Sequence, residues 1–244
     1  MILRSVTKHI NEQNWFAVWV DFVIVVVGVF VGIEVANWNE VQNERADEKV
    51  IIERLIDEFE VNLEVLASDK AEHVEVVKAT NTLLSMIGPE PELPKNDKEI
   101  AAVLLACLTN PVFVPRLGTT NSLIASGDLK LIGDGELQAT LTEWPAKAEE
   151  IGEWQIIERH HGEELILGLT FDYLAWPTLD KHLTGTGTDS RFVSDYKGLL
   201  SSIKLEGLLN NRRWNNNASI ERIENLETET KLLIEKLTLR LNTI

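Results

Sequence analysis

The stretch WFAVWVDFVIVVVGVFVGIEVA, residues 15–36, decides the fold of this 244-residue chain because it is apolar enough to cross a lipid bilayer. Its core, residues 22–33, carries no charged side chain. A helix rises 1.5 Å per residue, so this stretch would extend about 33 Å, close to the ~30 Å hydrocarbon thickness of a membrane. A helix also satisfies its own backbone hydrogen bonds in lipid. The sequence therefore predicts a transmembrane anchor at residues 15–38, after a short N-terminal segment at residues 1–14.

The twelve-residue apolar core also fits the hydrophobic region of a cleavable secretory signal. Cleavage after Ala36 would place the charged Glu34 where signal peptidases require a small neutral residue. We therefore expect the anchor to stay attached to the mature chain, in contact with membrane lipid.

The flanks of the anchor predict its boundaries and orientation. Tryptophans favour the interface between membrane and water, and the expected interface anchors are Trp15, Trp19 and Trp38. The number of basic side chains is nearly the same on the two sides of the span, with Arg4 and Lys8 before it and Arg45 and Lys49 after it. The N-terminal amine tips this balance, so the positive-inside rule favours a cytoplasmic N-terminus and an exported C-terminal domain.

One face of the anchor combines two glycines with an acid. Gly28 and Gly32 form a G-x-x-x-G step, which lets two helix backbones approach closely and predicts helix association. Asp21 lies seven residues before Gly28, two helical turns away, and so on the same face. It is either an intramembrane acid acting as a proton or ion relay in a small oligomer, or a residue at the inner interface of a span that begins after it.

Residues 37–40, Asn-Trp-Asn-Glu, directly follow the span, and residues 122–132 read SLIASGDLKLI. With Asp21, Gly28 and Gly32, these segments resemble a family of bacterial single-pass membrane proteins of unknown function. The likeness covers roughly residues 15–66 and 119–145, and Asp21 stands where the family pattern has Glu. The resemblance implies a bacterial inner-membrane protein with an exported, periplasmic helical domain, and it implies no activity.

The composition excludes several partners and cross-links. A net charge of −16 and a pI near 4.7 oppose binding to nucleic acid and to anionic lipid headgroups. Cys107 is the only cysteine, so there is no intramolecular disulfide and no cysteine-based zinc site.

Residues 39–244 are predicted to form a helical domain, which makes the whole chain all-α with a transmembrane helix that continues into a helical bundle. Residues 41–87 contain no Pro or Gly, and their apolar residues follow helical spacing at Ile52, Leu55, Phe59, Leu63 and Leu66. The other face is acidic and is interpreted as solvated, with Glu53, Asp57, Glu58, Glu60 and Glu64.

Turn and cap residues divide the rest of the domain. Helices are expected over residues 98–108, from Thr120 or Asn121 to Gly127, and from Asp134 toward Leu169 with a kink at Pro145. Residues 172–192 are expected to be an irregular excursion, because Trp176-Pro177 and two glycines interrupt them. In the last segment, residues 215–219 are expected to cap a helix whose seam of Ile223, Leu226, Thr230, Leu233 and Leu237 packs back onto the domain.

Only one constellation invites a chemical interpretation. Glu158 and His161 have the E-x-x-H spacing of carboxylate-bridged di-iron bundles, but those sites need a second such pair, and none occurs here. Residues 160–164 are otherwise interpreted as a surface patch that titrates near neutral pH.

No catalytic motif and no cofactor are predicted. The leading hypothesis is a membrane-anchored structural or interaction protein that forms a homo-oligomer or binds another envelope protein. The alternatives are an ion-coupled channel or stator-like subunit that uses Asp21, and a metal-binding enzyme at Glu158 and His161.

Overall fold

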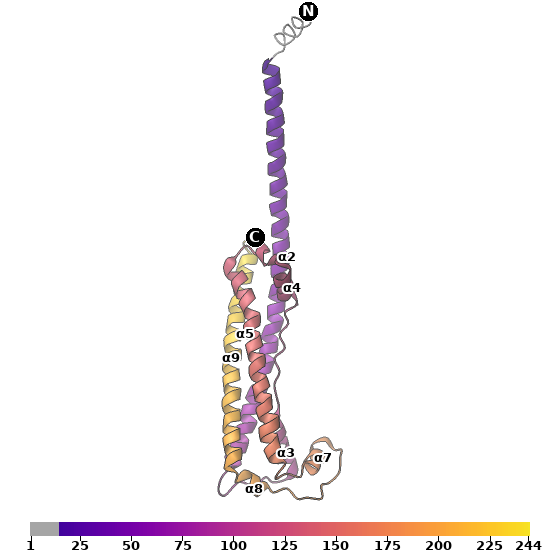
Figure 1. The fold of residues 1–244 in the computed structure, drawn as a ribbon, viewed down its shortest axis with the longest axis vertical. Coiled ribbons are helices and arrows are strands. Elements are labelled where there is room, and N and C mark those ends of the chain that lie inside the picture. Colours follow the sequence, from indigo (N-terminus) through magenta and orange to yellow (C-terminus); the bar gives the residue numbers. More distant parts are fainter. Residues whose placement is uncertain (1–14) are drawn as a thin grey trace, which may run out of the picture. The chain divides into compact units, whose positions relative to one another are not determined.

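The structure, a computed structural model, describes residues 15–244 and contains no strand among them (Figure 1). The predicted segment 1–14 lies outside the described residues. The α-helices in chain order are α2 (Trp15–Met86), α3 (Asp97–Leu108), α4 (Gly118–Ser126), α5 (Gly135–His160), α6 (Gly168–Thr170), α7 (Trp176–Thr184), α8 (Tyr196–Leu200) and α9 (Ile203–Leu241). A 3₁₀ turn, η1 (Asp128–Leu131), follows α4, and a π-helix, η2 (His161–Leu167), follows α5. The all-α prediction is confirmed.

The chain divides into two compact units, the first ending at Val50 and the second covering Ile51–Thr243. Helix α2 contributes to both, since it runs without a break to Met86. Its first part contains the one stretch within residues 15–244 that is long and apolar enough to cross a membrane, and none of that stretch is buried. A helix with apolar side chains exposed all around it suits a lipid environment. The N-terminal part of α2 is thus a candidate membrane span, as predicted.

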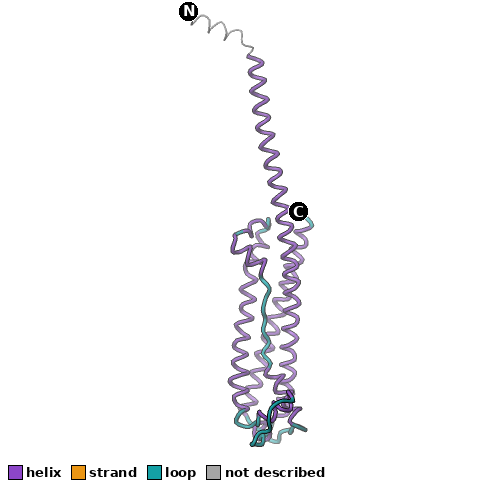
Figure 2. Tube along the Cα trace, turned by 90° about the vertical axis from the view of Figure 1, so that its right-hand side faces the viewer, coloured by secondary structure: helices purple, strands orange, loops and turns teal. Residues whose placement is uncertain are grey.

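In the second unit, α5, α9 and the rest of α2 lie side by side as a three-helix bundle (Figures 1 and 2). Each helix buries a seam whose residues are alternately three and four positions apart, a 3.5-residue repeat typical of coiled coils. In α2 the buried seam is Ile52, Leu55, Phe59, Asn62, Leu66, Asp69, His73, Val76, Thr80 and Leu83. In α9 it is Leu205, Leu209, Arg212, Asn216, Ser219, Ile223, Leu226, Thr230, Leu233 and Leu237. The prediction that the last helix packs within the domain is confirmed.

Aromatic contacts join the three helices at the apolar half of the bundle. The ring of Phe59 on α2 meets the edge of Trp144 on α5 at a centroid distance of 5.2 Å. The indole Nε1–H of Trp144 donates a 2.9 Å hydrogen bond to Thr230 Oγ1 on α9. Trp144 is 1% exposed, so its buried polar atom needs this partner.

A second core forms where the short helices gather around the far end of α2. Helices α3, α7 and α8 and the beginning of α9 bury apolar residues together there, including Leu83, Leu104, Cys107, Leu179, Leu199 and Leu205. Cys107 is a free, buried thiol, and burial raises its pKa above the usual range.

The predicted caps at Gly127 and Asp134 are confirmed, and the cap predicted for the start of α4 is wrong. Gly127 ends α4 with a positive φ of 76°, and the Asp134 side chain accepts hydrogen bonds from the first N–H groups of α5. Helix α4, however, begins at Gly118 and not at Thr120 or Asn121. Its first N–H groups donate to the carboxylate of Glu58 on α2. The prediction that Glu58 belongs to a solvated acidic face is therefore also wrong.

Two further boundaries differ from the prediction. Part of the expected excursion is helix α7, because Pro177 stands in the first turn, where a missing N–H costs no hydrogen bond. Helix α9 begins at Ile203, capped by the Ser202 side chain, so residues 215–219 lie well inside it and are not caps.

Helix α5 continues past Pro145, as predicted, but it then changes its winding. From His161 to Leu167 the chain forms π-helix, and α6 follows directly. His161 is 8% exposed, whereas the side chain of the neighbouring His160 is exposed and pairs with Glu164 at 3.0 Å. The interpretation of residues 160–164 as a surface patch is therefore wrong for His161.

Candidate functional site

The bundle carries polar and ionisable side chains at one level of its buried seams. They replace apolar residues in a core, where unpaired polar groups are costly, so their partners decide what they can do. We call this set the interior polar cluster: Asp69 and His73 of α2, Gln155 and Glu158 of α5, and Asn216 and Ser219 of α9, all at most 5% exposed.

Gln155 holds the α2 and α5 parts of the cluster together. Its Oε1 accepts a 2.7 Å hydrogen bond from the backbone N–H of Phe113, and this bond fixes the orientation of the amide. The Nε2 group therefore faces α2. It donates to both carboxylate oxygens of Asp69, at 3.0 and 2.9 Å, and lies 3.1 Å from His73 Nε2.

This arrangement determines the role of each His73 nitrogen. Gln155 Nε2 is a donor, so its contact with His73 Nε2 is a hydrogen bond when that ring nitrogen accepts. His73 Nδ1–H then donates to Asn216 Oδ1 at 2.8 Å. The other half of that amide is fixed as well, since Asn216 Nδ2 donates to the Arg212 carbonyl at 3.0 Å. These hydrogen bonds hold the His73 imidazole between α2, α5 and α9.

Only one of the two carboxylate oxygens of Glu158 accepts a hydrogen bond. Its Oε1 accepts a 2.8 Å hydrogen bond from Ser219, whereas its buried Oε2 accepts none. His73 Nδ1 lies 3.6 Å from that oxygen. His161, the other residue of the predicted E-x-x-H pair, also has a buried nitrogen, Nδ1, without a hydrogen bond. Burial lowers the pKa of His161 below its usual range.

Arg212 closes the cluster on the side of α3. Its guanidinium donates to the carbonyls of Cys107 at 3.2 Å, Glu158 at 2.6 Å and Thr109 at 2.6 Å, and to Asn110 Oδ1 at 3.1 Å. The side chain is fully buried, and burial lowers its pKa. One charge thereby binds four acceptors from two parts of the chain, residues 107–110 and Glu158.

Gly162 makes room for this guanidinium at the beginning of η2. A Cβ there would lie 3.1 Å from Arg212 Nη1 and 3.2 Å from Asn110 Oδ1, which is too close for an ordinary contact. The glycine is thus explained by packing against a charge.

Asp69 is an acid of the cluster whose pKa is shifted by its surroundings. Burial raises its pKa to about 6, against the lowering effects of His73 and of the hydrogen bond from Gln155. Glu72 and Glu158 raise it further. The cluster can therefore take up a proton in mildly acidic solution.

The predicted metal site gains no further ligands from the fold. Among residues 15–244, no group of three or more His, Cys, Asp or Glu side chains is arranged to hold an ion. The Glu158 carboxylate accepts a hydrogen bond from Ser219 and lies near His73, whereas His161 meets Glu158 through a backbone hydrogen bond, from its N–H to the Glu158 carbonyl.

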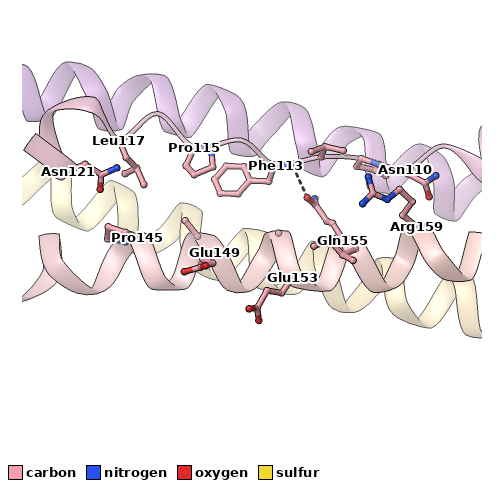
Figure 3. A pocket seen from close by; sticks show the side chains of 15 residues that line it. Asn110, Phe113, Pro115, Leu117, Asn121, Pro145, Glu149, Glu153, Gln155 and Arg159 are labelled. Carbon is pink, nitrogen blue, oxygen red and sulfur yellow. Dashed lines mark hydrogen bonds between the residues drawn. The ribbon is translucent and has the colours of Figure 1, made fainter.

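A groove borders the cluster on the outside of the bundle, between α5 and the extended residues 110–117 (Figure 3). It has a volume of about 700 Å³. Asn110 and Arg159 lie at one end, and Leu117, Asn121 and Pro145 lie at the other. We call it the α5 groove.

The outer wall of the α5 groove is attached to the bundle at two places. Phe113 is bound through its N–H to Gln155, as described above. Arg116 exchanges two hydrogen bonds of 2.7 Å with Asn62 on α2, one from its N–H and one to its carbonyl. Side chains of the core thereby substitute for the backbone partner that an extended segment would have in a sheet.

The residues singled out in the anchor all lie in the first unit. Asp21, Trp19 and Trp38 are exposed, and a Cβ at Gly28 or Gly32 would meet no atom within 4 Å. Trp15 is the first described residue. Nothing within residues 15–244 therefore requires glycine at these two positions.

Sequence reasoning missed the interior polar cluster, although a signal was present. Asn62, Asp69 and His73 continue the three-and-four spacing of Ile52, Leu55 and Phe59. Polar residues at seam positions mark a polar layer in a bundle, and the same spacing runs through Arg212, Asn216 and Ser219.

Comparison of the sequence with protein-family models and curated proteins, and of the fold with solved structures, finds no match.

Proposed function

We propose that this chain is a membrane-anchored interaction protein that associates with itself through its anchor and presents a helical domain to other envelope proteins. In this proposal it belongs to the bacterial inner membrane, with its N-terminus in the cytoplasm and the domain in the periplasm. It would then be a member of the single-pass family that the Asn-Trp-Asn-Glu segment resembles.

The proposal rests on one observation, which is that the two parts of α2 have different surfaces. Its first part exposes apolar side chains in all directions, whereas from Ile52 onward it buries a regular seam in the bundle. One continuous helix therefore belongs to both an apolar, lipid-compatible segment and a folded domain. Such a chain is suited to tether a protein surface to a membrane.

The glycine face of the anchor supports self-association. Gly28 and Gly32 have open space where a Cβ would stand, so the single chain gives no packing reason for them. Glycine in a helix interior costs stability relative to alanine, and a close helix contact is the usual reason for a G-x-x-x-G step in lipid.

Cross-linking in detergent tests the proposal. Replacing both Gly28 and Gly32 by Leu should reduce the cross-linked dimer of the full chain by at least several-fold, because the added side chains hold the helices apart. The matched control replaces Val26 and Phe30 by Leu on the opposite face, and it should keep the dimer. An equal yield of dimer from both double variants would contradict association through the glycine face.

A second candidate, an ion-coupled subunit, is favoured by the position of Asp21. Its carboxylate lies on the glycine face of an apolar helix, where an acid is expensive unless it has a function. Asp21→Asn should then leave cross-linking unchanged and abolish proton-dependent activity in cells. Full activity of that variant would remove this candidate.

A further inference from the structure

The α5 groove has the features of a binding surface for an extended chain. One wall, residues 110–117, is itself extended between Pro111 and Pro115. Val112 on this wall is 63% exposed and Ile156 on the α5 wall is 58% exposed, so apolar side chains face solvent on both sides. Exposed apolar surface lining a concave site is typical of protein interaction sites.

Gly152 keeps the middle of the α5 groove open. It lines the groove within the 26-residue helix α5, where glycine destabilises the helix relative to alanine. A Cβ there would meet no atom within 4 Å, so packing within the chain does not require glycine. A segment bound in the groove against α5 would explain the glycine, because a side chain at this position would take its space.

The charge of the groove indicates the chemistry of that occupant. Glu149 and Glu153 lie along its α5 side (Figure 3), and both are exposed. Within residues 15–244, no cation forms an ion pair with either carboxylate, and Arg159 lies at the end of the groove beyond them. The whole chain carries a net charge of −16, so the acidic surface of a second copy does not complement these carboxylates.

We propose that the α5 groove binds an extended peptide segment of a partner protein that carries apolar side chains and two basic side chains. The two carboxylates are one helical turn apart, about 6 Å along the axis. In an extended peptide, alternate residues are separated by about 6.6 Å. The two basic side chains therefore stand at alternate positions of the segment. The inference rests on the proposed interaction function and names the partner chemistry for it.

Three fluorescein-labelled heptapeptides serve as probes, with the sequence V-P-X-V-X-P-V and Lys, Gln or Glu at both X positions. Binding to the full chain in detergent micelles is followed by fluorescence anisotropy at low salt. The Lys peptide should bind about tenfold more tightly than the Glu peptide, with the Gln peptide between them, because two exposed ion pairs form or are replaced by repulsion.

Two variants and one control locate the binding. Gly152→Leu should weaken binding of the Lys peptide at least tenfold, because the side chain fills the groove. Gly207→Leu on α9 is the control, since Gly207 is also helical with no atom within 4 Å of a Cβ, and it should bind as the wild type does. Replacing both Glu149 and Glu153 by Lys should reverse the preference in favour of the Glu peptide.

The proposal is overturned if none of the peptides binds, if all three bind equally, or if Gly152→Leu binds normally. It is also overturned if Gly152→Leu abolishes concentration-dependent association of the chain itself, because the occupant would then be a second copy. These outcomes are independent of the anchor, so failure of the groove and failure of the Gly28 and Gly32 test can be told apart.

Discussion

Replacing Asp69 by asparagine tests the electrostatics of the interior polar cluster. In the folded chain, burial raises the pKa of Asp69 from 3.8 to about 6. The folded state therefore holds a proton that the unfolded state has already released between these two pH values. Stability must then fall as the pH rises through this window, because the free energy of unfolding decreases wherever the native state binds more protons.

The magnitude follows from the pKa difference. A rise from 3.8 to about 6 corresponds to roughly 3 kcal/mol of unfavourable free energy for the ionised carboxylate in the fold. Asparagine is uncharged and keeps one oxygen that can accept the hydrogen bond from Gln155. We expect Asp69→Asn to unfold with about the same free energy as the wild type near pH 4, and with roughly 3 kcal/mol more near pH 7.

Urea unfolding of the full chain in detergent, followed by circular dichroism, measures this difference at several pH values. Comparing variant and wild type at each pH cancels the contributions of other carboxyl groups. Asp57→Asn, on the exposed side of the same helix, is the control for removing a carboxylate from α2. A stability difference for Asp69→Asn that is constant with pH, or that favours the wild type at pH 7, would refute the reasoning.

Two other substitutions test the contacts around the cluster. Arg212→Met should destabilise the domain by roughly 3 to 5 kcal/mol, because several buried carbonyl groups lose their donor. The thermal midpoint measures this, and Arg213→Met, whose bonds are solvent-exposed, should cost under about 1 kcal/mol. Asn62→Ala should release the outer wall of the α5 groove at a cost of about 2 kcal/mol. Hydrogen exchange of residues 112–117 should then accelerate, and unchanged protection would show that Asn62 does not hold the wall.

The sequence predicted the elements whose signal is local. Residues 15–36 are apolar whatever surrounds them, so the candidate span could be recognised without a structure. The end of α4 at Gly127 and the start of α5 at Asp134 were predictable. A glycine with positive φ and a side-chain cap both depend on neighbouring residues only. The apolar seam of the last helix was likewise a property of its own spacing.

The errors fall where a distant residue replaces a local signal. Helix α4 has no side-chain cap of its own, and Glu58, about sixty positions earlier, supplies the acceptors for its first turn. Asn216 and Ser219 have the residue types of caps, yet they lie inside α9 because His73 and Glu158 satisfy them there. The π-turn at His161 carries no sequence signal that distinguishes it from ordinary helix.

The sequence by itself determined that this chain is helical, that one stretch of it is suited to lipid, and that residues 52–66 and 223–237 carry apolar side chains at steps of three and four residues. Only the tertiary structure decided that the polar seam positions of three helices meet at one level, and that residues 110–117 leave an open groove beside them. The physical reason is that hydropathy and spacing belong to one helix. The partner of a buried polar group depends on the register between helices, which no single helix specifies.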